Sequence, residues 1–173
     1  METNVLKSEK FNEYIQTCKD DVKNHSTEGY YHFDKVAEAY EKGFNDGQNV
    51  SEKTFLKSFI DKEIEKFTQK ANQIYILSKK VISLLEENNY QIDSLYIGLS
   101  FDKPSVIISV ENETLNNDEF ARIAYTRIFK VKEIYDELFD EVLDIGLVGS
   151  DNLDEEILKD EGFDYIEQYA SNE

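Results

Sequence analysis

The stretch SLYIGLSFDKPSVIISV at residues 94–110 decides the fold of this chain. On each side of Asp102-Lys103-Pro104, apolar side chains alternate with small or polar ones, which is typical of a strand with one buried face. A short segment with a proline between two such runs predicts a β-hairpin. Pro104 lies at the expected turn, where a missing amide donor costs little.

The sequence after the hairpin changes from helical to alternating periodicity twice. The expected elements, in chain order, are a helix over 117–141, a strand over 143–147, a short helix over 154–160 ended by Gly162, and a strand over 163–167. This order predicts an α+β fold, with a small antiparallel or mixed four-stranded sheet and helices on one face.

The N-terminal half has helical periodicity throughout. Two short helices are expected over 8–23 and 34–46, followed by a long third helix from about Ser51 to about Asn88. Uninterrupted, this helix would be roughly 55 Å long at 1.5 Å per residue. The alternative is a break at Thr68-Gln69-Lys70 that gives two ordinary helices.

The third helix carries apolar residues at alternating steps of four and three, a spacing typical of helix pairing. We therefore expect residues of this seam to be covered either by the first two helices or by a second copy of the chain. The residues assigned to self-association are Ile60, Ile64, Phe67, Ile74 and Val81. For domain organisation we expect a helical region at 1–71, which is either separate or an extension of the same domain, and an α+β domain at 72–173.

The composition is that of a chain able to form a core without disulfides or metal. Among its 173 residues, 40% are hydrophobic, with 11 Tyr and 11 Phe. Cys18 is the single cysteine, and together with His25 and His32 it does not provide the set of ligands that a zinc site needs. No signal peptide or membrane span is apparent, so we expect a cytoplasmic protein without a cofactor.

Acidic residues are concentrated at the C-terminal end. The net charge is -18, and residues 133–173 contain 15 Asp and Glu against one base, Lys159. Such a field repels DNA, RNA and anionic membranes, so we expect a basic protein as partner and no direct nucleic-acid binding. The residues expected to form the docking face are Glu133, Asp136, Glu137, Asp140, Glu141, Asp144, Asp154 and Glu155.

One short motif suggests catalysis. The sequence Gly146-Leu147-Val148-Gly149-Ser150 resembles the glycine-serine turn of the nucleotidyltransferase superfamily, whose members place two metal-binding carboxylates on a following strand. The resemblance implies a metal-dependent enzyme that uses Ser150, Asp160 and Asp164. These acids and Glu167 lack the alternate spacing that puts two carboxylates on the same side of one strand.

These observations favour a noncatalytic acidic interaction module, either an inhibitor, an immunity-type protein or an adaptor, that docks on a basic, nucleic-acid-binding protein surface. In such a complex the carboxylates would take the place of phosphates. Two alternatives stay open: the nucleotidyltransferase-like enzyme, and a structural or assembly protein whose acidic surface is inert.

Overall fold

The computed structural model describes residues 11–17, 50–99 and 103–169. The chain divides into two compact units, Met1–Lys70 and Ala71–Glu173. Residues 11–17 are helical, within the first helix predicted from the sequence. The expectations that lie outside the described residues are the second short helix at 34–46 and the side chains of Cys18, His25 and His32.

Helix α3 is one uninterrupted helix of 38 residues, Val50–Glu87. The predicted long helix is therefore confirmed, and the break at residues 68–70 does not occur. The segment contains neither proline nor glycine, and Thr68 donates a hydrogen bond from its hydroxyl to the Ile64 carbonyl at 2.7 Å. Asn89, with a φ of 63°, ends the helix in the left-handed conformation that asparagine tolerates.

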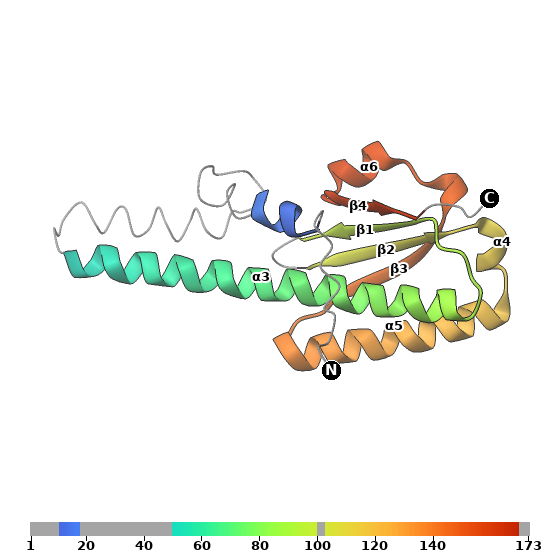
Figure 1. The fold of residues 1–173 in the computed structure, drawn as a ribbon, viewed down its shortest axis with the longest axis horizontal. Coiled ribbons are helices and arrows are strands. Elements are labelled where there is room, and N and C mark those ends of the chain that lie inside the picture. The colour runs from blue at the N-terminus through green and yellow to red at the C-terminus, as the bar shows by residue number, and fades with distance from the viewer. Residues whose placement is uncertain (1–10, 18–49, 100–102, 170–173) are drawn as a thin grey trace. The chain divides into compact units, whose positions relative to one another are not determined.

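The second unit contains a four-stranded mixed sheet with the strand order β3-β2-β1-β4 (Figure 1). The strands are β1 (Ser94–Gly98), β2 (Ser105–Val110), β3 (Asp144–Gly149) and β4 (Tyr165–Gln168). β1 pairs antiparallel with β2 and β4, which confirms the hairpin, whereas β2 and β3 are parallel. Between these parallel strands the chain forms α4 (Asn112–Leu115) and α5 (Asp118–Phe139).

The main core lies on the sheet face that α5 and the second-unit part of α3 cover (Figure 1). The register places Leu95 opposite Ile108 and Ile97 opposite Val106, and all four side chains are buried. The helices bury most of the apolar residues on their inner sides, namely Ala71, Ile74, Val81 and Leu85 of α3 and Phe120, Ala124, Ile128, Val131 and Tyr135 of α5. The predicted α+β fold class is confirmed.

A second, smaller cluster forms on the opposite face. Tyr96 alternates with Leu95 and Ile97 along β1, so its ring points away from the main core. It is buried together with Leu158 of α6 (Glu155–Asp160) and Phe163. The second-unit part of α3 and helix α5 thus share one face, as predicted, whereas α6 lies on the other face, which corrects the expectation that all helices lie on one face (Figure 1).

Both ends of α5 are defined by local chemistry. The Asn117 side chain accepts hydrogen bonds from the amides of Glu119 and Phe120, at 2.9 and 3.0 Å, and so caps the first turn. At the other end Asp140 has a φ of 55°, and its amide donates to the Asp136 carbonyl at 2.8 Å. Within the described part of the chain, no helix combines the length and apolar composition that crossing a membrane requires.

Candidate functional site

The acidic residues predicted as a docking face fall into two groups. The first group lies at the C-terminal end of α5, where Glu133, Asp136, Glu137 and Asp140 are exposed and Glu141 is half-buried. No salt bridge within the described ranges engages any of the four exposed carboxylates. They are therefore available to bases of another molecule.

The second group has structural roles inside the unit. Asp144 pairs with Lys103 at 3.3 Å and Lys132 at 3.5 Å, and these lysines, chiefly the Lys103 hydrogen bond, hold the pKa of its carboxyl below the ordinary value. Asp154 caps α6 by accepting from two backbone amides. Glu155 accepts from the Tyr96 hydroxyl at 3.4 Å. These three carboxylates are less available for docking than the α5 group.

The α5 group lies where helix electrostatics disfavour carboxylates. The carbonyl end of a helix carries a partial negative charge, which stabilises bases and destabilises acids in the last turn. The last turn of α5 contains no base, and the acids Asp136 and Glu137 are followed by Asp140 at the helix end. Local stability therefore does not explain why acids occupy these positions.

Two large apolar side chains lie among these carboxylates. Leu138 is 56% exposed and Val142 is 62% exposed, four residues further along the chain. Helical periodicity predicts that Leu138 lies on the same inner side as Val131 and Tyr135, and this prediction is wrong, because the buried residues of α5 end one turn earlier at Tyr135. We define the acidic end of α5 as Glu133, Asp136, Glu137, Leu138, Asp140 and Val142.

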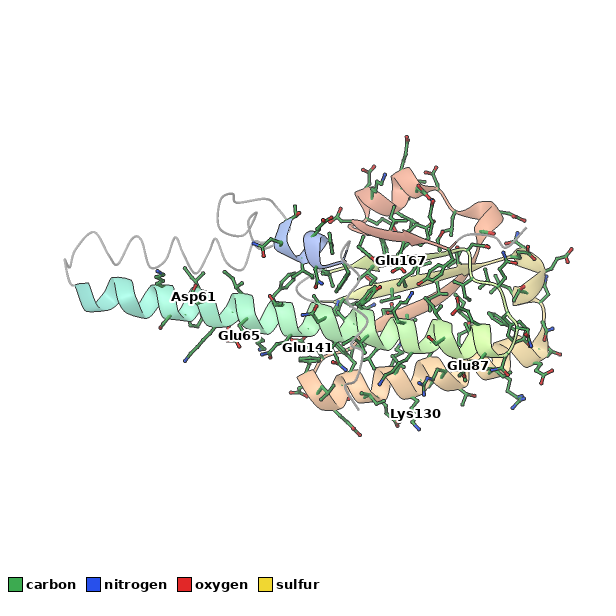
Figure 2. All side chains as sticks on the ribbon, in the orientation of Figure 1. Asp61, Glu65, Glu87, Lys130, Glu141 and Glu167 are labelled. Atoms are coloured by element: carbon green, nitrogen blue, oxygen red, sulfur yellow. The ribbon has the colours of Figure 1, made fainter. Side chains whose placement is uncertain are left out.

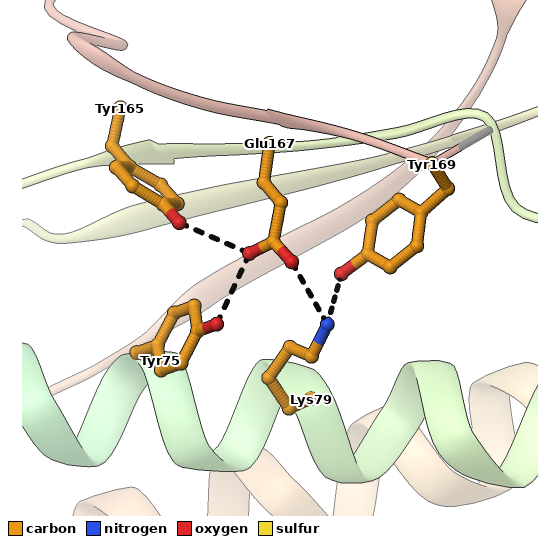
Figure 3. A network of polar contacts seen from close by, with 5 residues as sticks. All are labelled: Tyr75, Lys79, Tyr165, Glu167 and Tyr169. Atoms are coloured by element: carbon orange, nitrogen blue, oxygen red, sulfur yellow. Dashed lines mark hydrogen bonds and ion pairs between the residues drawn. The ribbon is translucent and has the colours of Figure 1, made fainter. Parts of the chain in front are cut away.

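A second polar arrangement lies between α3 and β4 and was not predicted (Figure 3). Lys79 donates to Glu167 at 3.0 Å and to the Tyr169 hydroxyl at 2.5 Å, and its ammonium lies 4.4 Å from the Tyr169 ring centroid. The other oxygen of Glu167 accepts from the hydroxyls of Tyr75 and Tyr165, at 3.1 and 3.0 Å. We call these five residues the Lys79–Glu167 cluster.

The Glu167 carboxylate is stabilised in its ionised form. Burial alone raises the pKa of this carboxyl, but the hydrogen bond and charge of Lys79, with the hydroxyls of Tyr165 and Tyr75, outweigh burial and hold the pKa below the ordinary value. Burial also raises the pKa of the Tyr169 hydroxyl, and the Glu167 charge adds to this effect. Because the donors and acceptors satisfy one another, the cluster is suited to joining α3 to β4.

The residues of the nucleotidyltransferase resemblance belong to different elements of the second unit. Ser150 begins the 3-10 helix η2 (Ser150–Asn152), and Asp160 and Asp164 are exposed. Glu167 is turned to Lys79 of α3 (Figure 3). Among the described residues, no group of three or more His, Cys, Asp and Glu is placed to hold a metal ion.

The residues assigned to self-association are divided between the two units. Ile74 and Val81 belong to the core of the second unit, with 1% and 0% exposure, so they cannot contact another molecule. In the first unit Ile60 is 38% exposed, and Ile64 and Phe67 are half-buried. Self-association through these three remains a prediction.

Tyr135 offers a direct test of the core beneath the acidic end of α5. Its hydroxyl is buried and has no hydrogen-bond partner among the described residues, and burial, with a smaller contribution from Glu141, raises its pKa. Since an unpaired buried hydroxyl costs free energy, Tyr135→Phe is expected to raise the free energy of unfolding by about 1–2 kcal/mol. Urea unfolding followed by circular dichroism measures the change.

The matched control for this substitution is Tyr125→Phe, since Tyr125 lies on the same helix but is 45% exposed. It is expected to change the free energy of unfolding by less than about 0.5 kcal/mol. A loss of stability in Tyr135→Phe would show that the hydroxyl has a partner in solution and would contradict the prediction.

Comparison with known proteins does not assign this chain to a class. No protein-family model matches the sequence, and neither curated proteins nor solved structures give a significant match. Function must therefore be argued from the surface and its chemistry.

Proposed function

We propose that this chain is a noncatalytic interaction module that docks the acidic end of α5 on a partner protein with a basic surface. The observation that carries the proposal is the exposure of Leu138 and Val142, at 56% and 62%, among exposed carboxylates that form no salt bridge with any residue the structure describes. Large exposed apolar side chains surrounded by polar ones are typical of protein-interaction sites.

The two kinds of side chain would contribute differently to binding. Leu138 and Val142 expose apolar area to water in the free protein. Burial of this area at the centre of the interface would supply most of the binding affinity. Glu137 and Asp140 at the rim would act mainly on the association rate and on the choice of partner. The net charge of -18 extends this selection over long distances at low salt.

A partner surface that normally binds nucleic acid fits this chemistry. Such surfaces present Lys and Arg to phosphates, and a row of carboxylates offers the same sign of charge. A module bound there would exclude the nucleic acid, so we favour an inhibitor over an adaptor. The position of Asp136, Glu137 and Asp140 at the carbonyl end of α5 supports the proposal, since carboxylates reduce helix stability there and the last turn contains no base.

The proposal is tested by affinity capture from the lysate of the source cells at low salt, followed by elution at high salt. We compare the wild-type chain with Leu138→Ser/Val142→Ser and with the control Asp160→Asn/Glu161→Gln, which removes two exposed carboxylates from the end of α6. A basic protein that is retained by the wild type and the control, but lost with the apolar variant, supports docking through the acidic end of α5.

Addition of nucleic acid to the captured complex distinguishes the two roles. An inhibitor is expected to be released by competing DNA or RNA, whereas an adaptor bound elsewhere on its partner is not. Retention of the same partner by the variant Leu138→Ser/Val142→Ser would show that this surface is not the docking site.

A further inference from the structure

The solvent side of α5 carries a stripe with symmetric spacing. Its residues are Arg122, Tyr125, Phe129, Glu133 and Asp136, at successive steps of three, four, four and three. At 3.6 residues per turn these five side chains lie on one face of the helix. Phe129 is its centre, and it is also near the middle of α5, which extends from Asp118 to Phe139.

The stripe is exposed and has an aromatic centre. Phe129 is 67% exposed, and Tyr125, 45% exposed, lies against it with the ring centroids 6.5 Å apart. Figure 2 shows Lys130, the next residue of the helix, projecting from the side of α5 away from the sheet. Exposure of so large a part of a phenylalanine side chain to water is unfavourable, so burial of the stripe against another surface would be stabilising.

The charges of the stripe are complementary to themselves. Arg122 lies seven residues before Phe129, and Asp136 lies seven residues after it. If a second copy of α5 lies antiparallel with the two Phe129 side chains at the crossing point, each Arg122 faces the Asp136 of the other copy. Tyr125 then faces Glu133, whose carboxylate can accept from the phenol hydroxyl.

We infer that two copies of this chain associate through an antiparallel pair of α5 helices, with the twofold axis at Phe129. The arrangement is isologous, as in most homodimers, and each favourable contact occurs twice. It also places the acidic C-terminal end of each α5 beside the N-terminal end of the other, where the helix dipole stabilises carboxylates.

Two features limit the strength of the association. In the antiparallel register Asp118 faces Asp140, an unfavourable pair at the exposed rim, and Arg122 already forms an exposed pair with Glu119 at 3.8 Å. A standard interface buries about 800 Å² on each partner, and a single pair of helices buries less than this area. We therefore expect a weak dimer, with a dissociation constant between about 1 μM and about 1 mM.

The net charge of -18 opposes association at long range, whereas the Arg122–Asp136 pairs act at short range. At about 0.15 M salt the screening length is about 8 Å, so repulsion between distant charges is largely removed. This is the salt concentration at which the dimer should be sought.

The dimer goes beyond the proposed docking function and is centred on another side of α5, although Glu133 and Asp136 belong to both surfaces. Leu138 lies three residues after the buried Tyr135, whereas Phe129 lies on the solvent side of the helix. Substitutions of Leu138 and of Phe129, each of which belongs to one surface only, therefore serve as controls for each other. A dimer would also display two acidic ends of α5, with the two Leu138 residues roughly 27 Å apart along the helix axis at 1.5 Å per residue.

Sedimentation velocity of the full chain, from about 1 μM to about 1 mM at about 0.15 M salt, tests the inference over the affinities expected. The wild type is expected to change from monomer to dimer with concentration. Phe129→Ser should raise the dissociation constant at least about tenfold, because the residue is lost from both sides of the interface centre. Leu138→Ser should leave it unchanged.

A charge exchange tests the register independently of the aromatic centre. Arg122→Asp and Asp136→Arg should each weaken association, because like charges then face each other. An equal mixture of the two variants should recover it, since both pairs become Asp–Arg, and so should the double exchange in one chain. Circular dichroism confirms that each variant is folded.

A chain that stays monomeric up to about 1 mM would overturn the inference. So would a mixture of the charge variants that associates no better than either alone. Association that survives Phe129→Ser but is lost in Ile60→Ser would place self-association on α3 instead and would also overturn it.

Discussion

Replacement of Glu167 by Gln is expected to lower the free energy of unfolding by about 2–3 kcal/mol. The carboxylate accepts hydrogen bonds from Lys79, Tyr75 and Tyr165, and its side chain is 22% exposed. An amide in its place removes the charge that balances the ammonium of Lys79, whose side chain is 15% exposed. It also directs an N–H group at donors that then lack an acceptor.

Urea unfolding followed by circular dichroism measures this change, since the chain has no Trp. The control is Glu161→Gln, an exposed residue after α6, with an expected change below about 0.5 kcal/mol. Lys79→Met should destabilise by a similar amount to Glu167→Gln. The double variant Lys79→Met/Glu167→Met should be less destabilised than the two single substitutions of Lys79 and Glu167 added together, because no uncompensated charge is left. Strict additivity would show that the two side chains do not interact.

The effect of Glu167→Gln on the free energy of unfolding is expected to depend on pH. The pKa of Glu167 is lower in the folded chain than in the unfolded one, so its charge stabilises the fold above the unfolded pKa, about 4.3 for Glu. This contribution is lost as pH falls through the folded pKa, when the carboxylate takes up its proton. The difference between wild type and Glu167→Gln should thus be constant near pH 7 and diminish below about pH 4. A difference that grows on acidification would contradict the assignment.

The elements that could be predicted from the sequence are those with strong local signals. The continuity of α3 follows from a segment without Pro or Gly, and the start of α5 follows from the cap Asn117. The hairpin follows from alternation on both sides of Pro104. In each case residues close in sequence determine the result, so no knowledge of distant contacts was needed.

The direction of strand pairing could not be predicted. Alternation in residues 143–147 indicates a strand but does not say whether it lies parallel or antiparallel to its neighbour. The parallel pairing of β2 with β3 depends on how α5 packs against the sheet. Helix α4 was missed because four residues, Asn112–Leu115, are too few to show a periodicity.

The candidate site was predicted only in part, because a count of charges does not say which charges are already paired. Asp144 and Asp154 looked equivalent to Glu137 and Asp140 in sequence, yet the first pair has partners inside the chain. The Lys79–Glu167 cluster joins residues 88 positions apart. Tyr165, Glu167 and Tyr169 alternate in the sequence, which could have indicated that their side chains share one face. Because the strand was expected to end at residue 167, Tyr169 was not considered with the other two.

The acidic end of α5 is expected to show opposite effects on stability and on binding. Glu137→Gln/Asp140→Asn should raise the free energy of unfolding by about 0.5–1.5 kcal/mol, since two negative charges leave the carbonyl end of the helix. Asp140→Gly in place of Asp140→Asn should raise the free energy of unfolding further, because glycine has no Cβ to strain the left-handed conformation at a φ of 55°. The comparison of Asn with Gly at this position separates charge from backbone.

Binding should change in the other direction. Against a basic partner captured by the wild-type chain, Glu137→Gln/Asp140→Asn should lower the association rate about tenfold at low salt and much less at high salt, where charges are screened. The control Asp160→Asn/Glu161→Gln removes the same number of charges from the end of α6 and should have a small effect on the association rate. If the two pairs of substitutions slowed association equally, total charge rather than the acidic end of α5 would select the partner. A gain in stability joined to a loss in association rate, confined to the α5 pair, would mean that binding retains these carboxylates at a position where folding disfavours them.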